Sequence, residues 1–474
     1  MSMAEFQALL PLVILGGTAI VVMLAAAFHH GHVTAAAVTV AGLVIALLSL
    51  FHLKLGAISS LLVIDRFALC YIGLIVLAAM VVTVLSHGYL SRFHLKPEEY
   101  YMLLLLATLG SCVIAASTHF AAFFLGLELL SVSLYVMIGY VFRRTTSMEA
   151  AVKYLILAAA SSAFLLFGMA LLYSEAGTME FRRLAIVLRE GATTWHPATV
   201  AGIVLMLTGI GFKLALVPFH WWTPDIYQGA PAPVGGFIAT VSKGAMIALL
   251  FRLFGDFDGF RESKLFTVFA IVAVASMTVG NLLALRQQNL KRILAYSSIS
   301  HLGYVLVAFL AGGSAAIEAA TFYLASYALA SLAAFGLIGA LSGRDGEPES
   351  VKSFEGLLWT RPWLALVLAA ALLSLIGLPL TAGFWGKFMV VTAGAKSGLW
   401  LLLVALALNS AVGLYYYLRI LLAACRPVAA PLFHPLCTSD GLMLGGMTVL
   451  SLLLGVFPAP VFDLIRSLVA AGVP

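Results

Sequence analysis

Long runs of apolar residues, separated by short polar connections, make up almost the whole chain. A helix that crosses a bilayer needs about 20 consecutive apolar residues, so we count about fourteen predicted membrane-spanning segments. They lie near residues 9–28, 33–53, 67–85, 100–116, 119–142, 148–173, 200–217, 234–254, 265–285, 292–310, 315–341, 363–393, 399–424 and 442–456. The polar connections are too short to hold separate soluble domains. The pattern therefore predicts a single all-α polytopic membrane domain over residues 1–474.

Two of these segments are interrupted by proline and glycine close to a lysine. In the seventh segment Pro218 follows Lys213, and in the twelfth Gly377 and Pro379 precede Lys387. Proline removes a backbone donor and clashes with the preceding turn, so we expect each helix to stop or kink there. A backbone carbonyl freed in lipid costs several kcal/mol unless protein or water satisfies it. The two breaks therefore predict a hydrated, protein-lined region, and such paired breaks are typical of the two halves of a transporter.

The composition excludes a soluble globular protein. Of the 474 residues, 63% are hydrophobic and only 10% are charged, against about 25% charged residues in soluble domains. The first apolar segment follows Met-Ser-Met-Ala-Glu5 without a basic stretch or a cleavage pattern, so we expect an uncleaved span. The net charge of +6 is spread over short loops, which suits membrane topology and anionic headgroups and leaves no basic stripe for nucleic acid.

The sequence carries no recognisable cofactor motif. Its four cysteines, at positions 70, 112, 425 and 437, show no C-x-x-C spacing, which argues against an iron–sulfur or zinc site. Patterns for haem attachment and dinucleotide binding are also missing from the sequence. We therefore expect no cofactor and no metal in this chain, and we expect any redox chemistry that drives it to lie in other polypeptides.

Ionisable residues inside or beside the apolar segments are the candidates for carrying protons. They are Glu128, Lys153, Lys213, Lys243, His301 and Lys387. A charge at the centre of a spanning helix costs roughly 2.5–3.5 kcal/mol even on a lenient scale, so such residues usually mark an ion or proton path. Glu128 and Lys213 lie well inside their segments. For both, the alternative is a neutral side chain that a neighbouring helix satisfies.

Three of the lysines have a simple structural alternative as well. Lys243 lies one or two turns into its segment and can extend its side chain to the interface. Lys153 follows Glu149 by four residues, which is the spacing of an ordinary ion pair on a helix. Lys387 comes after the second break and can anchor a helix end. Its parallel with Lys213 nevertheless favours a functional role.

His301 belongs to a polar stripe within an otherwise apolar segment. Ser297, Ser298 and Tyr304 are three or four residues away, so they share its helix face and can hold a chain of water molecules. A histidine that is satisfied inside the protein remains the alternative. The three tyrosines at 415–417 are expected at the membrane interface, where aromatic residues gather.

A buried lysine can take up and release a proton when a carboxylate approaches or withdraws. At about 4 Å and an effective dielectric constant near 20, two unit charges interact by about 4 kcal/mol, which corresponds to about three pKa units. Glu128 facing Lys213 is the pair that we expect to switch in this way. Lys243 and His301 are then expected to relay the proton toward Lys387.

These residues lie in motifs that resemble a known family, the antiporter-like membrane subunits of respiratory complex I. The motifs are LELLS (127–131), EAAVKY (149–154), GFK (211–213), PFHWWTPDIYQGAPAPV (218–234), YSSISHLGY (296–304) and GFWGKF (383–388). The resemblance covers essentially the whole chain. It implies fourteen helices in two inverted five-helix repeats, near residues 100–254 and 265–424, with flanking helices at both ends. It also implies that the six candidate residues form a central axis that carries protons.

The resemblance further implies a role as a subunit of a proton-translocating NADH:quinone oxidoreductase in a bacterial inner membrane. Its partners would be the neighbouring antiporter-like subunit and the small membrane subunits that lead to the quinone site. NADH, FMN, iron–sulfur clusters and quinone would all be bound by other subunits. Lys387 stands where one related subunit has a glutamate, and no long lateral helix follows the last segment. Each feature distinguishes this chain from one of the other antiporter-like subunits of the family.

Other functions remain open on sequence alone. Subunits of multisubunit cation/proton antiporters and of membrane-bound hydrogenases share the broken helices and their lysines. A scaffold that only anchors an assembly is a second alternative, which the many charges within the apolar segments disfavour. A solute carrier is a third, although no pattern indicates a pocket for an organic substrate.

Overall fold

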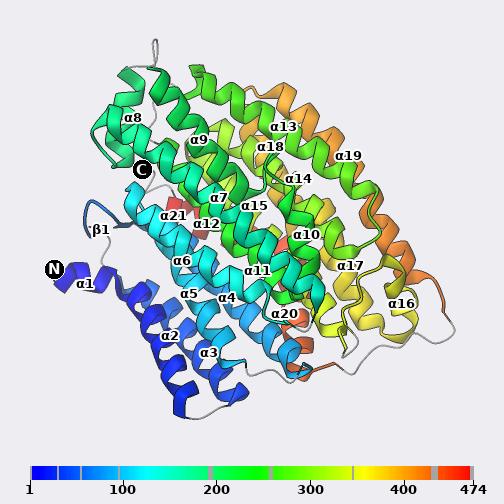
Figure 1. The fold of residues 1–474 in the computed structure, drawn as a ribbon. Coiled ribbons are helices and arrows are strands. Elements are labelled where there is room, and N and C mark those ends of the chain that lie inside the picture. Colours follow the sequence, from blue (N-terminus) through cyan, green and yellow to red (C-terminus); the bar gives the residue numbers. More distant parts are fainter. Residues whose placement is uncertain are drawn as a thin grey trace.

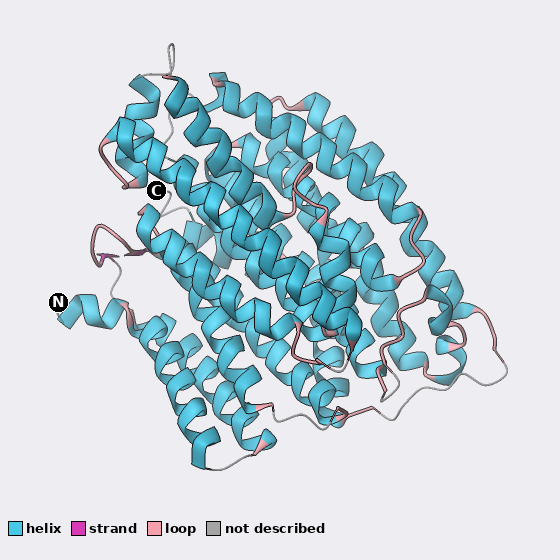
Figure 2. Cartoon of the chain, viewed as in Figure 1, coloured by secondary structure: helices cyan, strands magenta, loops and turns pink. Residues whose placement is uncertain are grey.

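The chain folds almost entirely into α-helices (Figures 1 and 2). The structure, a computed structural model, describes residues 3–28, 31–53, 56–93, 97–142, 144–190, 196–255, 260–343, 346–428 and 436–469. Within these residues the only strands are β1 (Gly56–Ala57) and β2 (Val63–Ile64), which pair antiparallel. The prediction of an all-helical polytopic membrane protein is confirmed.

Thirteen helices of the described chain are long and apolar enough to cross a membrane. They are α2 (Leu10–Phe28), α3 (His32–Ser49), α4 (Arg66–Ser91), α5 (Glu98–Ala116), α6 (Phe120–Ile138), α7 (Thr145–Ala176), α9 (Pro197–Leu214), the continuous run from α11 to α12 (Ala232–Gly255), α13 (Lys264–Leu285), α14 (Leu290–Ala311), α15 (Gly313–Leu341), α19 (Trp400–Cys425) and α20 (Thr438–Val456). The shorter apolar helix α17 (Pro362–Ile376) continues after a break as α18 (Ala382–Lys396). Each predicted segment overlaps one of these elements.

The remaining helical elements are short. They are α1 (Met3–Ala8), α8 (Phe181–Glu190), α10 (Trp222–Gly229), α16 (Leu357–Thr360), α21 (Ala459–Val469), three 3₁₀ turns at Leu50–His52, Phe260–Glu262 and Val351–Phe354, and one π turn. The π turn (Ile238–Ser242) joins α11 (Ala232–Phe237) to α12 (Lys243–Gly255). Sequence analysis missed α8 and α21, because amphipathic helices of about three turns lack the long apolar run that marks a span.

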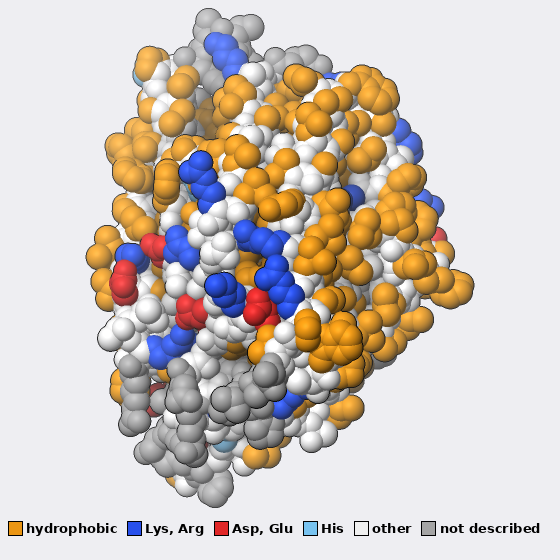
Figure 3. Space-filling model, turned by 90° about the vertical axis from the view of Figure 1, so that its right-hand side faces the viewer, with side chains coloured by type: hydrophobic (Ala, Val, Ile, Leu, Met, Phe, Trp, Pro, Cys, Tyr) orange, Lys and Arg blue, Asp and Glu red, His pale blue; other side chains and the backbone are white. Residues whose placement is uncertain are grey.

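Burial separates central helices from peripheral ones. In α14 every residue of the apolar window is buried, whereas in α2 only 28% of that window is buried. Helices α12, α14 and α15 lie in the middle of the bundle, with α2 and α3 at one edge and α13 and α19 at the other (Figure 1). The outer surface is rich in exposed apolar side chains, and in Figure 3 hydrophobic residues gather along the right-hand side of the face, beside a group of charged side chains. Such a surface fits contact with lipid.

Glycines let neighbouring helices approach closely, as is common in membrane bundles. A Cβ atom on Gly110 would lie 2.6 Å from the carbonyl oxygen of Gly126, so α5 and α6 meet backbone to backbone. The same holds for α7 and α9, where a Cβ atom on Gly168 would lie 2.7 Å from the Gly202 oxygen. This close packing pairs α5 with α6 and α7 with α9. Three of the candidate residues lie on these helices, Glu128 on α6, Lys153 on α7 and Lys213 on α9.

Both predicted helix breaks are present. Helix α9 ends at Leu214, where Ala215 turns left-handed at φ 59°, and the Val217–Pro218 peptide bond is cis. Helix α17 ends at Ile376, where Gly377 has φ 84°, and α18 begins only at Ala382. A further interruption separates α10 from α11 at Ala230 and Pro231. The two inverted repeats that the resemblance implies remain a prediction.

Candidate functional site

Polar side chains satisfy the backbone groups that the first break releases. The Trp222 indole donates to the Phe212 carbonyl at 2.9 Å, and the Val217 amide donates to Ser276 Oγ at 3.0 Å. At the interruption after α10, Ser147 Oγ donates to the Gly229 carbonyl at 2.7 Å. These side chains come from elements distant in the sequence. A break at membrane depth is therefore stabilised by the surrounding protein, as the low polarity of lipid requires.

The second break is satisfied by the lysine that follows it. Lys387 Nζ donates to the Ile376 carbonyl at 2.6 Å, which closes the C-terminal end of α17. The Gly383 amide donates to Ser374 Oγ at 3.1 Å. A Cβ atom on Gly383 would lie 1.8 Å from the Ser374 carbonyl oxygen, so this position admits only glycine. As predicted, a lysine lies close to each break, Lys213 before the first and Lys387 after the second.

Lys213 lies near the end of α9 and is buried, with 3% of its surface exposed. Its Nζ donates to Ser131 Oγ of α6 at 2.6 Å and lies 5.4 Å from the centre of the Tyr154 ring. Glu128 lies one turn before Ser131 and accepts from Ser162 Oγ at 2.5 Å. Within the described chain Lys213 forms no ion pair, so the expected Glu128–Lys213 pair interacts only over a longer distance in this structure.

Lys243 follows the π turn and is completely buried. Its Nζ donates to Ser298 Oγ of α14 at 2.6 Å and lies 5.6 Å from the centre of the Tyr227 ring. Tyr327 OH of α15 donates to the same Ser298 oxygen, also at 2.6 Å. The side chain therefore points into the bundle and does not extend to the interface. Short π segments inside α-helices are frequently found at functional sites.

Lys387 is partly buried and borders a cavity of about 430 Å³. Besides the Ile376 carbonyl it binds Ser410 Oγ of α19 at 2.7 Å, and it lies 5.1 Å from the centre of the Tyr304 ring. Apolar side chains, among them Phe384, Phe388 and Leu414, form much of the cavity wall. Lys387 thus borders an open, mostly apolar recess.

The three lysines share one arrangement, in which an amine binds a serine hydroxyl and lies over a tyrosine ring. The sets are Lys213 with Ser131 and Tyr154, Lys243 with Ser298 and Tyr227, and Lys387 with Ser410 and Tyr304. A serine hydroxyl can accept a hydrogen bond from an ammonium or donate one to a neutral amine. A carboxylate, in contrast, favours the ammonium alone. The arrangement is therefore compatible with both protonation states of each lysine.

His301 lies between the second and third sets. Its Nδ1 is 2.5 Å from Tyr323 OH and its Nε2 is 3.2 Å from Tyr417 OH, which also bonds to Ser297. Its ring also packs against Tyr327, which bonds to Ser298 of the second set, and against Tyr304 of the third set. His301 therefore lies between the two lysines, with one of these tyrosine rings beside each of them. We call Glu128, Lys213, Lys243, His301 and Lys387, with their serine and tyrosine partners, the polar axis.

The prediction of an interfacial tyrosine belt is wrong for two of its three members. Tyr416 and Tyr417 are buried, each with 1% of its surface exposed, and Tyr417 contacts His301 in the polar axis. Tyr416 OH donates to Asn281 Oδ1 at 3.0 Å. Only Tyr415, 63% exposed, faces outward. Three consecutive residues of a helix necessarily point in different directions, so the run could not lie on one face.

Lys153 lies apart from the polar axis. Its side chain is 44% exposed, and its Nζ binds Glu149 at 2.7 Å and Asp225 at 3.0 Å. Asp225 also pairs with Arg292 at 2.7 Å. The ion pair with Glu149 that the spacing suggested is therefore present. Asp225 therefore links Lys153 to Arg292, near the N-terminal end of α14.

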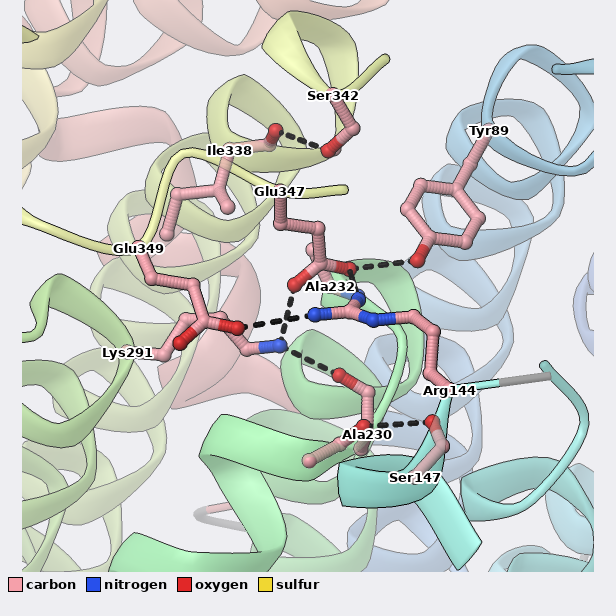
Figure 4. A network of polar contacts seen from close by, with 12 residues as sticks. Tyr89, Arg144, Ser147, Ala230, Ala232, Lys291, Ile338, Ser342, Glu347 and Glu349 are labelled. Atoms are coloured by element: carbon pink, nitrogen blue, oxygen red, sulfur yellow. Dashed lines mark hydrogen bonds and ion pairs between the residues drawn. The ribbon is translucent and has the colours of Figure 1, made fainter. Parts of the chain in front are cut away.

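Sequence analysis missed a second buried group of charges (Figure 4). Glu347 has a completely buried side chain and receives Lys291 at 2.5 Å, Tyr89 OH at 2.6 Å and the Ala232 amide at 3.0 Å. Arg144 lies 3.3 Å from it. We call Glu347, Lys291 and Arg144 the buried ion cluster.

The buried ion cluster ties α4, α7, α11 and α14 to the connection after α15, and Lys291 also binds the freed Ala230 carbonyl at 2.6 Å. Burial alone raises the pKa of Glu347, but the charges of Lys291 and Arg144 outweigh it and hold the pKa below its ordinary value of 4.5. The sequence offers only a weak signal for this cluster, because Glu-Pro-Glu at 347–349 looks like a solvated loop. In the described part of the chain, no group of three or more His, Cys, Asp or Glu side chains could hold a metal ion.

Comparisons with known proteins identify the family. The family described as "NADH:quinone oxidoreductase/Mrp antiporter, TM" matches residues 117–413, more than half of the chain. A chain of respiratory complex I from Thermus thermophilus with bound aureothin is 34% identical, with a TM-score of 0.83, and the match covers 98% of this chain and all of that one.

Two more distant structures share the fold. One chain belongs to the membrane-bound sulfane sulfur reductase, an archaeal respiratory membrane complex, at 24% identity and a TM-score of 0.83. Another belongs to the Mrp complex from Dietzia sp. DQ12-45-1b, at 20% identity and a TM-score of 0.84. Each match covers 98% of this chain and 97% of the other. This protein therefore belongs to the family of antiporter-like membrane subunits found in complex I and Mrp antiporters.

Proposed function

We propose that this chain is a proton-translocating membrane subunit of an NADH:quinone oxidoreductase, complex I, in a bacterial inner membrane. Protons pass along the polar axis while quinone is reduced elsewhere in the complex. The residues that carry them are Glu128, Lys153, Lys213, Lys243, His301 and Lys387. Lys153 lies outside the polar axis at a partly exposed position, and it contributes through its ion pairs with Glu149 and Asp225.

The observation that carries this proposal is the repeated set of lysine, serine and tyrosine. Lysines that serve only to hold helices together gain most from a carboxylate partner, because an unpaired buried charge is costly. Within the described residues, Lys213, Lys243 and Lys387 bind hydroxyl and carbonyl oxygens and form no ion pair. This choice of partners favours side chains that change protonation state over side chains that anchor an assembly.

Within the family, we propose that the chain is subunit N. Support comes from Lys387, which stands at the position where a related antiporter-like subunit has a glutamate. The chain of Thermus complex I that matches over its full length agrees with assignment to complex I. The neighbouring antiporter-like subunit and the small membrane subunits are then its partners. NADH, FMN, the iron–sulfur clusters and quinone bind to other subunits.

The second candidate is a subunit of a multisubunit cation/proton antiporter or of a membrane-bound hydrogenase. It has support because the fold is also that of chains in the Mrp complex and in the sulfane sulfur reductase. Purification of the native complex in mild detergent, followed by identification of its polypeptides, separates the two. Flavin- and iron–sulfur-containing subunits with NADH activity support complex I, and their absence from an intact complex contradicts it.

The proposed function is tested with Lys213→Ala, Lys243→Ala and Lys387→Ala in membrane vesicles. We expect the complex to assemble and NADH-driven acidification of the vesicle lumen to be lost or strongly reduced. Lys396→Ala is the matched control, because Lys396 is an exposed lysine at the end of the same helix as Lys387. If all three axis variants assemble and pump at the control rate, the chain is not a proton carrier and a scaffold is favoured.

A further inference from the structure

An asparagine on a peripheral helix binds two tyrosines close to His301 and Lys387. Asn281 lies on α13, at the edge of the bundle next to α19 (Figure 1), yet only 1% of its surface is exposed. Its Nδ2 donates to Tyr304 OH of α14 at 3.2 Å and to the Asn409 carbonyl of α19 at 2.9 Å. Its Oδ1 accepts from Tyr416 OH of α19 at 3.0 Å. Both ends of the amide have partners, so the side chain is held in one orientation and joins three helices.

Tyr304 is the residue through which Asn281 reaches the polar axis. The Tyr304 ring lies 5.1 Å from Lys387 Nζ and 5.6 Å from the centre of the His301 ring. A tyrosine ring can turn about two side-chain bonds, and the second of these torsions has broad minima. A hydrogen bond to the hydroxyl at the far end of the ring restricts both rotations. Asn281 therefore fixes the ring that contacts both the imidazole and the amine.

Tyr416 links the same amide to a second neighbour of His301. The Tyr416 ring lies 4.4 Å from the ring of Tyr417, measured between centres. The hydroxyl of Tyr417 is 3.2 Å from His301 Nε2. One amide of α13 thus positions two tyrosines, of which one contacts His301 directly and the other packs against a contact of His301.

The helices that Asn281 joins are also held together by other contacts. A Cβ atom on Gly280 would lie 2.8 Å from the Tyr296 carbonyl oxygen, so α13 and α14 meet backbone to backbone. Arg419 of α19 donates to the Leu285 carbonyl at the C-terminal end of α13, at 3.2 Å. A fully bonded polar group inside a bundle makes the arrangement of its partners rigid and unique. The partners of Asn281 include the tyrosine that lies between a histidine and a lysine of the polar axis.

We propose that Asn281 is a positioning residue for proton transfer between His301 and Lys387, and that it acts by holding the Tyr304 ring. This inference rests on the proposed function, since it concerns one step along the polar axis. In that step an N–H bond of the protonated imidazole breaks and an N–H bond to the neutral amine forms, so the positive charge moves with the proton. Asn281 carries no proton itself, because a carboxamide is not among the side chains that titrate.

The test measures the initial rate of NADH-driven proton pumping by the native complex in membrane vesicles. Asn281→Leu removes the amide and keeps a side chain of similar size. We expect it to lower the rate by about fivefold, because the ring loses the hydrogen bond that holds it. Tyr304→Phe removes the same bond from its other end and should lower the rate by the same factor. Thr278→Val is the matched control on the same pair of helices, since Thr278 bonds to Asn409 at 3.3 Å, and it should pump like the parent.

The double variant Asn281→Leu/Tyr304→Phe distinguishes positioning from a general effect on packing. If both changes act through one bond, the combined loss stays at about fivefold, whereas independent effects would multiply to about 25-fold. Assembly of every variant is checked on a native gel. A loss of packing alone has no reason to disappear when the Tyr304 hydroxyl is already missing.

The inference is overturned if Tyr304→Phe pumps like the parent, and this result is decisive even where Asn281→Leu fails to assemble. It is also overturned if Asn281→Leu pumps normally, if the double variant loses about 25-fold, or if Thr278→Val loses as much as Asn281→Leu. In each of these cases the proposed function stands as long as Lys387→Ala does not pump. If Lys387→Ala itself pumps at the control rate, the proposed function and the step that Asn281 assists are both wrong.

Discussion

Replacement of Glu347 by alanine gives the sharpest test of the packing that surrounds the polar axis. This carboxylate accepts hydrogen bonds from Lys291, Tyr89 and the Ala232 amide, and it lies 3.3 Å from Arg144. The side chains of Glu347 and Lys291 are completely buried. Alanine would leave Lys291 with only the Ala230 carbonyl, whereas Arg144 would keep Glu349 at 2.9 Å.

The expected loss of stability follows from one buried charge left unpaired. Removal of one partner from a buried ion pair costs about 3–5 kcal/mol, because the remaining charge has no water to solvate it. Replacement of both partners by apolar residues is often nearly neutral. Addition of Lys291→Met to Glu347→Ala should therefore recover part of the loss. Such recovery is the signature of direct coupling between the two side chains.

The measurement is the free energy of unfolding of the purified protein, from titration with a denaturing detergent. Glu355→Ala is the control, because Glu355 pairs with the exposed Arg426 at 3.5 Å and such surface pairs contribute about 0–1 kcal/mol. If Glu347→Ala destabilises the protein by no more than the control does, the buried ion cluster does not stabilise the fold and the reasoning is refuted.

Three further predictions concern Glu347, Gly383 and Ser298. The pKa of Glu347 in the folded protein is held below 4.5. The ionised carboxylate therefore stabilises the fold fully above pH 4.5, and this stabilisation is lost as the pH falls through the lower pKa of the folded state. Unfolding temperatures recorded from pH 7 to pH 3 should show a decline that Glu347→Gln lacks. Gly383→Ala should abolish assembly, because its Cβ atom would meet the Ser374 carbonyl at 1.8 Å; Gly446→Ala, with no atom within 4 Å, should assemble normally on a native gel. Ser298→Ala removes the acceptor of Lys243 and Tyr327, so pumping in an assembled complex should fall by about 10-fold or more, whereas unchanged pumping would contradict a role for the serine hydroxyls.

Local chemistry explains what the sequence predicted well. Pro218, Gly377 and Pro379 act on the backbone at their own positions, so the two breaks could be placed before the structure was known. The burial of Lys213 followed from its position within a long apolar segment, whereas the sequence left open whether Lys243 reaches the interface. The helix count followed in the same way, because the length of a span depends only on bilayer thickness.

Contacts between residues that are far apart in the sequence could not be predicted from it. Ser131 lies 82 positions before Lys213, and Ser298 lies 55 positions after Lys243, so no periodicity links either serine to its lysine. Tyr417 was expected at the interface because buried and interfacial tyrosines look alike in a sequence. Glu347 was missed for a similar reason. A charge between two apolar segments looks like a solvated loop residue until a neighbouring helix is seen to cover it.

The π turn at Ile238–Ser242 determines where the amine of Lys243 points. Such a turn accommodates one residue more than the regular α-helical pattern allows. Tightening it into an α turn would rotate all of α12 by about 100° and slide it by about 1.5 Å. That rotation would swing Lys243 away from Ser298 and Tyr227 together. Deleting a single residue from this turn is thus the smallest edit that would separate Lys243 from both of its partners while leaving every titratable side chain in the chain.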